Sequence, residues 1–260
     1  MKQPLIRLLC GSACVALVAA GCGSDVTNKP AATPAAVAGK NVDATTAGTI
    51  TGQVRFEGVV PPADIIRMTA DKKCDPGAPN PKSDALLVAG DKGVANAFVY
   101  VKDGLDPGYT FDVPTEPAVL NQKGCIYTPR VLGVRVGQAI GIVNSDPTFH
   151  NVHAMPMNNR EFNHGQPKQF TTVSEVFTTP EVMVPFKCNA HTWMAAWVGV
   201  LPHPYFAVTD KAGVFSIAKL PPGTYTIEAW HEKLGRQTAK ITIAPGQTQP
   251  APITFTAPAK

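Results

Sequence analysis

The chain has 260 residues, of which 44% are hydrophobic and 16% are charged. This composition supports a sizeable buried core, excludes disorder throughout, and the length suits one large domain or two smaller ones. The formal net charge is only +4, which is too weak to indicate nucleic-acid binding or a polybasic membrane patch. The 25 prolines and 22 glycines favour a turn-rich all-β protein and argue against coiled coils, helical bundles and polytopic membrane proteins.

The first segment indicates export. Residues 1–21 carry basic residues followed by an apolar run that ends in small residues, which is the pattern of a secretory signal peptide and is too short for a membrane span. The end of this run, LVAAGC, resembles a bacterial lipobox, and the resemblance implies that Cys22 becomes the lipidated N-terminus. Ala19 stands where Leu is commoner, so a soluble periplasmic product is the alternative. Residues 22–47 are rich in Ala, Thr and Pro and are expected to form a flexible linker.

These features together predict a periplasmic protein that is held to the bacterial envelope by its lipid alone. Gly23 follows the lipidated cysteine, and the absence of Asp at that position favours the outer membrane or the cell surface.

The cysteines fit an oxidising compartment. Two of the six leave with the signal peptide and Cys22 takes the lipid, so three remain. Cys74 and Cys125 both lie in loop-like sequence and are the natural disulfide pair, because exported cysteines tend to be bridged. Cys188 is then a free thiol, which needs an explanation.

The rest of the chain alternates short β-type runs with turn signals, which is typical of β-sandwiches. The predicted strands are 50–56, 97–101, 118–121, 131–136, 139–144, 182–188, 197–201, 206–209, 214–218, 224–230 and 239–243. Residues 71–83 and 155–167 are polar and are predicted to be loops. A boundary near residue 202 divides a larger sandwich, 48–202, from a smaller one, 203–258.

Two segments carry residues that bind metals. The strand at 139–144 leads into a turn and then to His150, and the strand at 182–188 ends in a Cys-x-x-His-x-x-Met loop with Cys188, His191 and Met194. One thiolate, two imidazoles and one thioether are the ligands of a mononuclear blue-copper site, with the thioether as the weak axial ligand. His153 competes with His150, but residues three apart on a strand point to opposite faces, so only one of them can face the site.

With these residues, the segment 130–201 resembles the cupredoxin family. The family's His-Asn-Val motif matches residues 150–152, so the resemblance selects His150 and implies that Asn151 ties the two ligand-bearing segments together. It also implies that Cys188, His191 and Met194 complete the copper site. Only two residues separate His191 from Met194, where plastocyanin-like members usually have four.

Residues 48–257 as a whole resemble bacterial exported proteins that join a plastocyanin-like domain to a carboxypeptidase-regulatory-like, or transthyretin-like, domain. The segments that carry this resemblance are GCIYTP at 124–129, NSD at 144–146, the Cys188 loop, HPYFAVT at 203–209 and PPGTY at 221–225. Arg130 stands where relatives often have His. Domains of the second kind usually act as rigid spacers, and some bind carbohydrate or act in adhesion.

The remaining histidines and tryptophans have simpler interpretations. His164 lies in a polar segment and is expected to be solvated, whereas His203 and His231 are expected to be structural residues of the second domain. Trp197 is expected to pack in a core. For Trp193, core packing and an apolar rim for a docking partner are equally supported.

The sequence thus predicts a copper-containing electron carrier that is not an enzyme and that exchanges electrons with a redox protein partner. The electron is expected to leave through the His191 imidazole if its edge is exposed. No zinc motif, nucleophile elbow, phosphate loop or acid–base pair points to catalysis. The alternatives are a lipoprotein module that recognises polysaccharide or a protein, and a protein that sequesters copper without redox cycling.

Overall fold

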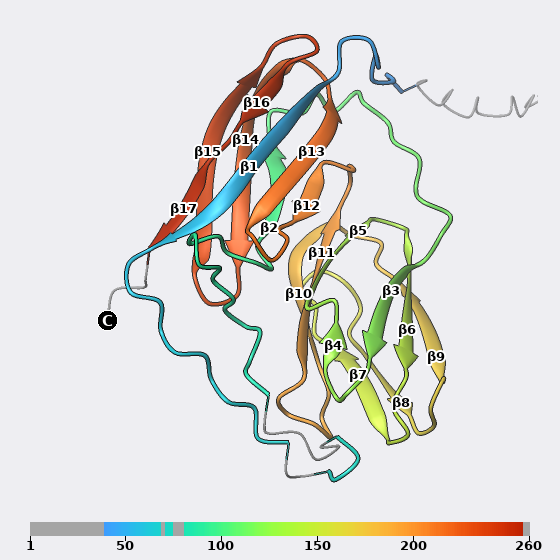
Figure 1. Ribbon diagram of the computed structural model, residues 1–260. Coiled ribbons are helices and arrows are strands. Elements are labelled where there is room, and N and C mark those ends of the chain that lie inside the picture. The colour runs from blue at the N-terminus through green and yellow to red at the C-terminus, as the bar shows by residue number, and fades with distance from the viewer. Residues whose placement is uncertain (1–38, 69–70, 75–80, 257–260) are drawn as a thin grey trace, which may run out of the picture. The chain divides into compact units, whose positions relative to one another are not determined.

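The computed structural model describes residues 39–68, 71–74 and 81–256 (Figure 1). Every regular element in these ranges is a strand, which confirms the predicted all-β class. No helix in this part of the chain is both long enough and apolar enough to cross a membrane. The predicted signal peptide, the lipidated Cys22 and the linker as far as residue 38 lie outside the described residues.

The end of the predicted linker is structured. The backbone N–H and the hydroxyl of Thr45 both donate to the Asp43 carboxylate, at 2.9 and 2.6 Å, and so form a local turn. Lys40 donates its N–H to the Gly108 carbonyl at 2.8 Å and accepts one from Thr110 at 3.1 Å. The Thr46 carbonyl also accepts the N–H of Gly246 at 2.9 Å, so both ends of residues 40–46 are attached to the folded body, unlike the flexible segment to residue 47 that the composition suggested.

The first sandwich consists of two sheets, which Figure 1 shows as separate layers. One sheet has the order β5 (Val131–Arg135), β11 (Ala195–Leu201), β10 (Glu181–Lys187), β7 (His150–Ala154) and β8 (Phe162–Gln166). The other has the order β4 (Tyr127–Thr128), β3 (Ala118–Gln122), β6 (Ala139–Asn144) and β9 (Thr172–Val176). Burial alternates strictly along β6, as expected of a strand with one face on the core.

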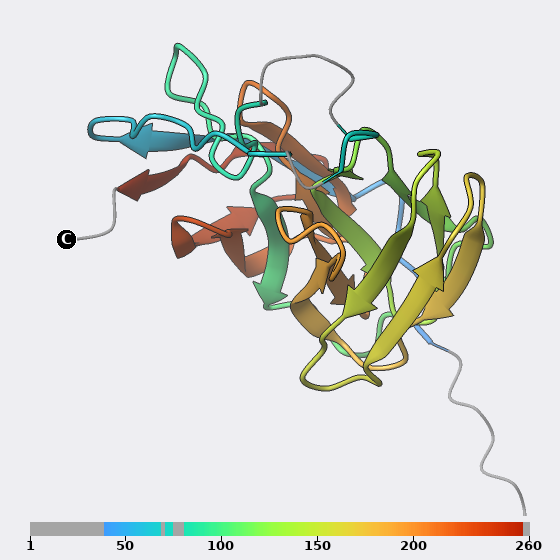
Figure 2. The same cartoon turned by 90° about the horizontal axis from the view of Figure 1, so that it is seen from below.

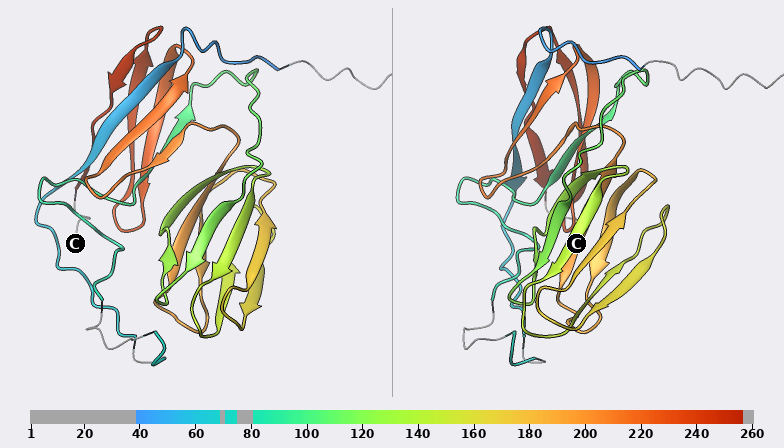
Figure 3. Two further views of the ribbon diagram at one scale, coloured as in Figure 1. Left: turned by 45° about the vertical axis from the view of Figure 1, so that its right-hand side comes forward. Right: turned by 90° about the vertical axis from the view of Figure 1, so that its right-hand side faces the viewer.

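The second sandwich contains strands from both ends of the described chain. One sheet has the order β13 (Val214–Leu220), β1 (Gly48–Glu57) and β16 (Thr248–Pro250), with β17 (Ile253–Thr256) also paired to β1. The other has the order β12 (Phe206–Val208), β2 (Phe98–Asp103), β14 (Gly223–His231) and β15 (Gly235–Ile243). β1 lies beside β13 in both views of Figure 3.

The first sandwich is therefore inserted between β2 and β12 of the second. This differs from the sequential division near residue 202, because the backbone partners of β1 and β2 come from the far end of the chain. Ile50 pairs with Ile217, and Phe98 pairs with both Val208 and Trp230. Local sequence patterns contain no information about such distant partners.

The segment predicted as a loop at 155–167 contains a strand, β8, which lies beside β7 (Figure 1 and Figure 2). In this pairing His150 is opposite Gln166. Although β8 is polar in composition, one of its polar residues is buried. The Gln166 amide donates to the carbonyls of Ile142 at 3.0 Å and Thr171 at 2.8 Å, so burial leaves this amide nitrogen paired. β8 thereby supports the first residue of β7, which is the candidate ligand His150.

The two sandwiches meet on a flat patch made by paired glycines. Gly133 of β5 lies opposite Gly199 of β11, and a Cβ atom on Gly199 would lie 2.5 Å from the ring of Phe98. The absence of side chains at these positions lets the fully buried Phe98 ring of β2 rest directly on β5 and β11. Trp197 and Trp230 extend this contact, with ring centroids 5.0 Å apart.

Arg130 adds an ionic connection between the sandwiches. Its guanidinium donates two bonds to Glu232, at 3.0 and 2.9 Å, and a third to Asp84 at 2.6 Å. The indole N–H of Trp197 also donates to Glu232, at 2.6 Å. These bonds join the two domains. The Arg130 side chain that makes them is only 12% exposed.

Candidate metal centre

Three of the predicted ligands meet at one end of the first sandwich. The Cys188 sulfur lies 3.9 Å from His150 Nδ1 and 3.6 Å from His191 Nδ1, and the three donor atoms all lie within 4.8 Å of one another. Their exposed fractions are 1% for Cys188, 0% for His150 and 3% for His191. The site therefore places one thiol and two imidazoles together, away from water.

The strand order explains this meeting. His150 is the first residue of β7, and Cys188 directly follows β10, the antiparallel neighbour of β7. His191 lies in the turn that leads from β10 to β11, where the N–H of Met194 donates to the His191 carbonyl at 2.9 Å. Met194 is 1% exposed and packs in the same hydrophobic cluster as Cys188. Its role as an axial ligand stays a prediction.

Asn151 ties the two ligand-bearing segments together, as the family resemblance implied. Its side-chain oxygen accepts the N–H groups of Asn189 at 2.7 Å and Ala190 at 3.3 Å, and it lies 3.4 Å from the Cys188 sulfur. One amide on β7 thus fixes the start of the loop after β10. The thiol is held where His150, the residue before Asn151, can reach it.

The outer nitrogen of His150 faces a carboxylate. His150 Nε2 lies 2.9 Å from Asp146, which also accepts the backbone N–H groups of Gly124 at 2.7 Å and Cys125 at 2.8 Å. Asn144 accepts the N–H of Asp146 at 2.9 Å and so shapes the turn before β7. Burial lowers the pKa of His150, which favours the neutral imidazole that binds metals.

The outer nitrogen of His191 faces a second carboxylate, from a distant segment. His191 Nε2 lies 3.4 Å from Asp71, which also accepts the Thr148 hydroxyl at 2.6 Å and the Lys73 N–H at 2.8 Å. The hydrogen bond from Thr148, followed by that from Lys73, lowers the pKa of Asp71. A charged carboxylate therefore lies at the outer edge of this imidazole.

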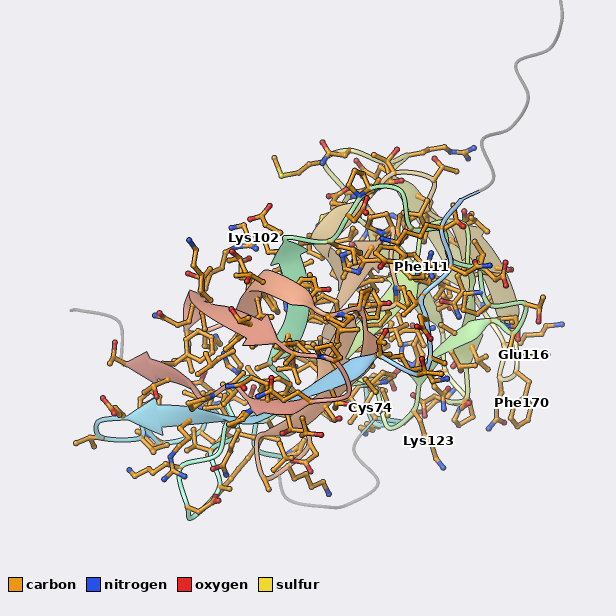
Figure 4. The ribbon with its side chains drawn as sticks, turned by 90° about the horizontal axis from the view of Figure 1, so that it is seen from above. Cys74, Lys102, Phe111, Glu116, Lys123 and Phe170 are labelled. Atoms are coloured by element: carbon orange, nitrogen blue, oxygen red, sulfur yellow. A yellow bond between two sulfur atoms is a disulfide. The ribbon has the colours of Figure 1, made fainter. Side chains whose placement is uncertain are left out.

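A disulfide between Cys74 and Cys125 lies beside these carboxylates. Figure 4 places Cys74 near the turn that carries Lys123, two residues before Cys125. The Trp193 indole donates to the Cys125 carbonyl at 2.9 Å, and its ring centroid lies 5.2 Å from that of His191. Asp71, Trp193 and the disulfide together surround His191, so the exposed imidazole edge considered for electron exit is absent.

The other predicted histidines lie apart from this cluster. His153 lies 2.6 Å from Glu161 and 3.4 Å from Asn189, and it joins none of the groups of potential metal donors found among the described residues. His164 lies on β8 beside Glu175. Burial lowers the pKa values of His203 and His231 to about 4, as suits neutral structural residues.

The sequence interpretation did not assign Asp71 or Asp146 a role at the site. Asp146 had a usable signal, since it lies four residues before His150 within the NSD motif. Asp71 had none, because it lies in a segment predicted only as loop and reaches His191 across 120 positions of sequence. Asp71 lies close to Cys74 in the sequence, but this indicates a position near the site only once the place of Cys125, the disulfide partner, is known.

The donor set fits copper. A thiol and two neutral imidazoles, buried together with a thioether-bearing residue in the same cluster, match the soft and borderline ligands that bind both copper oxidation states. The ligand loop also lies between two paired strands, which restrict its movement.

Comparison with known proteins identifies one domain family in this chain. Residues 198–256 match the family model of the carboxypeptidase regulatory-like domain, as the sequence resemblance predicted. No match to this chain is found among curated proteins.

Similar solved structures include cupredoxins. A purple cupredoxin from Nitrosopumilus maritimus is 21% identical, with 32% of this chain and 98% of that chain covered and a TM-score of 0.28. A methionine-to-alanine variant of amicyanin with Cu(I) is 21% identical, with coverages of 40% and 98% and a TM-score of 0.30. A copper-containing nitrite reductase from Thermus scotoductus is 19% identical, with coverages of 46% and 27% and a TM-score of 0.31.

Proposed function

We propose that this chain is a copper protein of the bacterial cell envelope that carries single electrons. The observation that carries the proposal is the buried cluster of His150, Cys188 and His191, whose three donor atoms lie within 4.8 Å of one another. These residues would hold the ion, and Met194 would supply a weak fourth ligand. Bound copper would supply a one-electron Cu(II)/Cu(I) couple.

The surrounding residues suit electron transfer because they keep the donors in place. Asn151 fixes the loop that follows Cys188, and the hydrogen bond from Met194 to His191 closes the next turn. A site whose ligands are held before the electron arrives reorganises little when the charge of the ion changes. The burial of the donors excludes water, which would otherwise reorganise around that charge.

The expected lipid on Cys22 would confine the carrier to the envelope, where a redox protein would be its partner. Because His191 is covered, we do not assign its imidazole edge as the contact point with that partner.

The first experiment is a Cu(II) titration of the chain from residue 23 onward, followed by its visible absorption spectrum. One copper per chain and an intense thiolate-to-copper band are expected, and the band should bleach reversibly with a reductant. Cys188→Ser should abolish the band, whereas His153→Ala, a change at a nearby histidine outside the donor cluster, should preserve it. A colourless protein, or one that binds only zinc, would contradict the proposal.

The second candidate function is a binding module that recognises polysaccharide or a protein partner. The match of residues 198–256 to a carboxypeptidase regulatory-like domain favours it, because some domains of this kind bind carbohydrate or act in adhesion. The Cys188→Ser variant separates the two functions, since binding by the second sandwich should survive loss of the thiol. Copper sequestration is distinguished by stoichiometric Cu(I) binding without reversible redox cycling.

A further inference from the structure

The outer nitrogen of each candidate imidazole faces a carboxylate. Both of these aspartates are hydrogen-bonded to the region around the same disulfide. We propose that Asp71 and Asp146 are positioning residues for the two copper-binding histidines and that the Cys74–Cys125 disulfide holds Asp71 in place. This proposal rests on the proposed copper function and specifies how the chain's own residues orient its ligands and set the balance between copper oxidation states.

Asp146 is a fixed acceptor for His150. Its carboxylate accepts two backbone N–H groups, from Gly124 and Cys125, so it is oriented independently of the histidine. Asp146 is 7% exposed, and its own N–H is bound by the buried Asn144. A carboxylate held in this way can select one orientation of the His150 ring, with Nε2 toward Asp146 and Nδ1 toward the Cys188 sulfur.

Asp71 performs the same task for His191, but its support comes from another part of the chain. The Asp71 carbonyl accepts the N–H of Cys74 at 3.0 Å, which makes a tight turn ending at the disulfide. The Thr148 hydroxyl binds the carboxylate from the turn that precedes His150. Because no regular strand includes Asp71, its position at His191 depends on these bonds and on the disulfide.

The arrangement has a definite electrostatic consequence. A carboxylate that accepts the outer N–H of an imidazole fixes the tautomer with a free Nδ1 and makes that nitrogen a stronger donor. The negative charges stabilise Cu(II) more than Cu(I), and the effect of Asp146, which is 7% exposed, is screened less by water than that of Asp71, whose side chain is 24% exposed. The two aspartates should therefore raise the affinity for Cu(II) and lower the reduction potential of the site.

The main test replaces each carboxylate by its neutral amide, in Asp71→Asn and Asp146→Asn. Affinities for Cu(II) and Cu(I) are measured by chelator competition, and the reduction potential is measured directly. We expect a roughly 10-fold to 100-fold loss of Cu(II) affinity and a smaller loss for Cu(I). A tenfold change in the ratio of the two affinities corresponds to an increase of about 59 mV for a one-electron couple.

Asp91→Asn is the matched control. It makes the same change of charge at an exposed carboxylate that binds Gln53, in the second sandwich, and it should leave both affinities unchanged. Asp71→Glu should recover part of the lost Cu(II) affinity, because it restores the charge. Unchanged Cu(II)/Cu(I) ratios in both amide variants would overturn the proposal.

The contribution of the disulfide is tested with the double variant Cys74→Ser and Cys125→Ser. Its potential and Cu(II) affinity should shift in the same direction as those of Asp71→Asn. In the double variant, Asp71→Asn should then add little further change. Full additivity of the two changes would show that the disulfide does not hold Asp71 at His191.

A measurement without metal separates this proposal from the copper function itself. Nitrogen-15 NMR of the metal-free wild-type protein should show both ligand rings as Nε2–H tautomers, and Asp71→Ala and Asp146→Ala should each weaken that preference in one ring. Nδ1–H tautomers in the wild type would overturn the positioning roles. Correct tautomers in a protein that fails to bind copper would instead contradict the proposed function.

Discussion

At the scale of single residues, Asn151 has the most concentrated set of contacts in the site. Its side-chain oxygen is the shared acceptor for two backbone N–H groups of the ligand loop and lies close to the Cys188 sulfur. Its amide nitrogen donates to Asn163 at 2.7 Å, which connects β7 to β8. The residue is 5% exposed, so water cannot readily replace these bonds.

Asn151→Ala should lower the free energy of unfolding of the metal-free protein by about 1–3 kcal/mol, because two N–H groups lose their acceptor. The loop after β10 should become mobile, and copper affinity should fall with it. Denaturant titration and chelator competition measure the two effects. Asn163→Ala removes only the bond on the exposed side and should cost less than about 1 kcal/mol. Equal losses in the two variants would contradict this role of Asn151.

The residues of the site differ in how far the sequence could predict them. Cys188 and His191 were predictable from the spacing of their Cys-x-x-His-x-x-Met loop, whereas His150 was selected over His153 only by the resemblance to the cupredoxin family. Asp71 was not predictable, since its function depends on a disulfide and a contact across 120 positions of sequence.

At the scale of elements, the paired glycines of β5 and β11 decide how the sandwiches meet. Gly133 and Gly199 lie directly opposite each other, and Phe98 fills the space that their missing side chains leave. The ring of Phe206 stacks on that of Phe98, with centroids 5.6 Å apart. The contact is therefore apolar and closely packed, and the bonds from Arg130 to Glu232 lie beside Trp197, which packs on the same cluster.

Phe98→Ala should lower the free energy of unfolding by about 3–5 kcal/mol, because it opens a cavity on a glycine patch that has no side chains to fill it. The copper absorption band should persist, because Phe98 packs in a different hydrophobic cluster from Cys188 and Met194. Val119→Ala is the control, since Val119 is 54% exposed and its truncation should change stability by at most about 0.5 kcal/mol. Denaturation curves and visible spectra of both variants test the prediction.

Strands were predictable where local patterns specified them and not where distant contacts did. β6 is a short run of mostly apolar, β-branched residues that follows Gly137, so its local sequence is sufficient to identify it. β8 is polar and was interpreted as a loop, and only its pairing with β7 and the bonds of Gln166 make it a strand. The pairing of β1 with β13 likewise could not be deduced from either sequence alone.

At the scale of the whole molecule, buried neutral histidines couple stability to pH. His231 is 1% exposed, and burial, followed by the positive charge of Arg130, lowers its pKa from 6.5 to about 4. Between these two values the unfolded chain binds a proton at this position and the folded chain does not. The free energy of unfolding therefore falls as the pH drops from 6.5 toward 4.

His231→Asn should flatten this dependence, because Asn does not titrate and its side-chain oxygen can replace Nδ1 as acceptor for the Lys233 N–H. A pKa lowered from 6.5 to about 4 corresponds to about 3 kcal/mol at pH 4, so the wild type should lose up to that much more stability than the variant between pH 6.5 and 4. Denaturant titrations across this range measure the difference. Parallel curves for the two proteins would contradict the prediction.

The insertion of one sandwich into the other also sets an order for folding during synthesis. All strands of the inserted domain, β3 to β11, are made consecutively, so this domain can close before the chain is finished. β1 has to wait, because its partners β13, β16 and β17 are made last. Until then the backbone edges of β1 are unpaired and its apolar face is exposed. The newly made chain is therefore most vulnerable to aggregation and proteolysis during this interval.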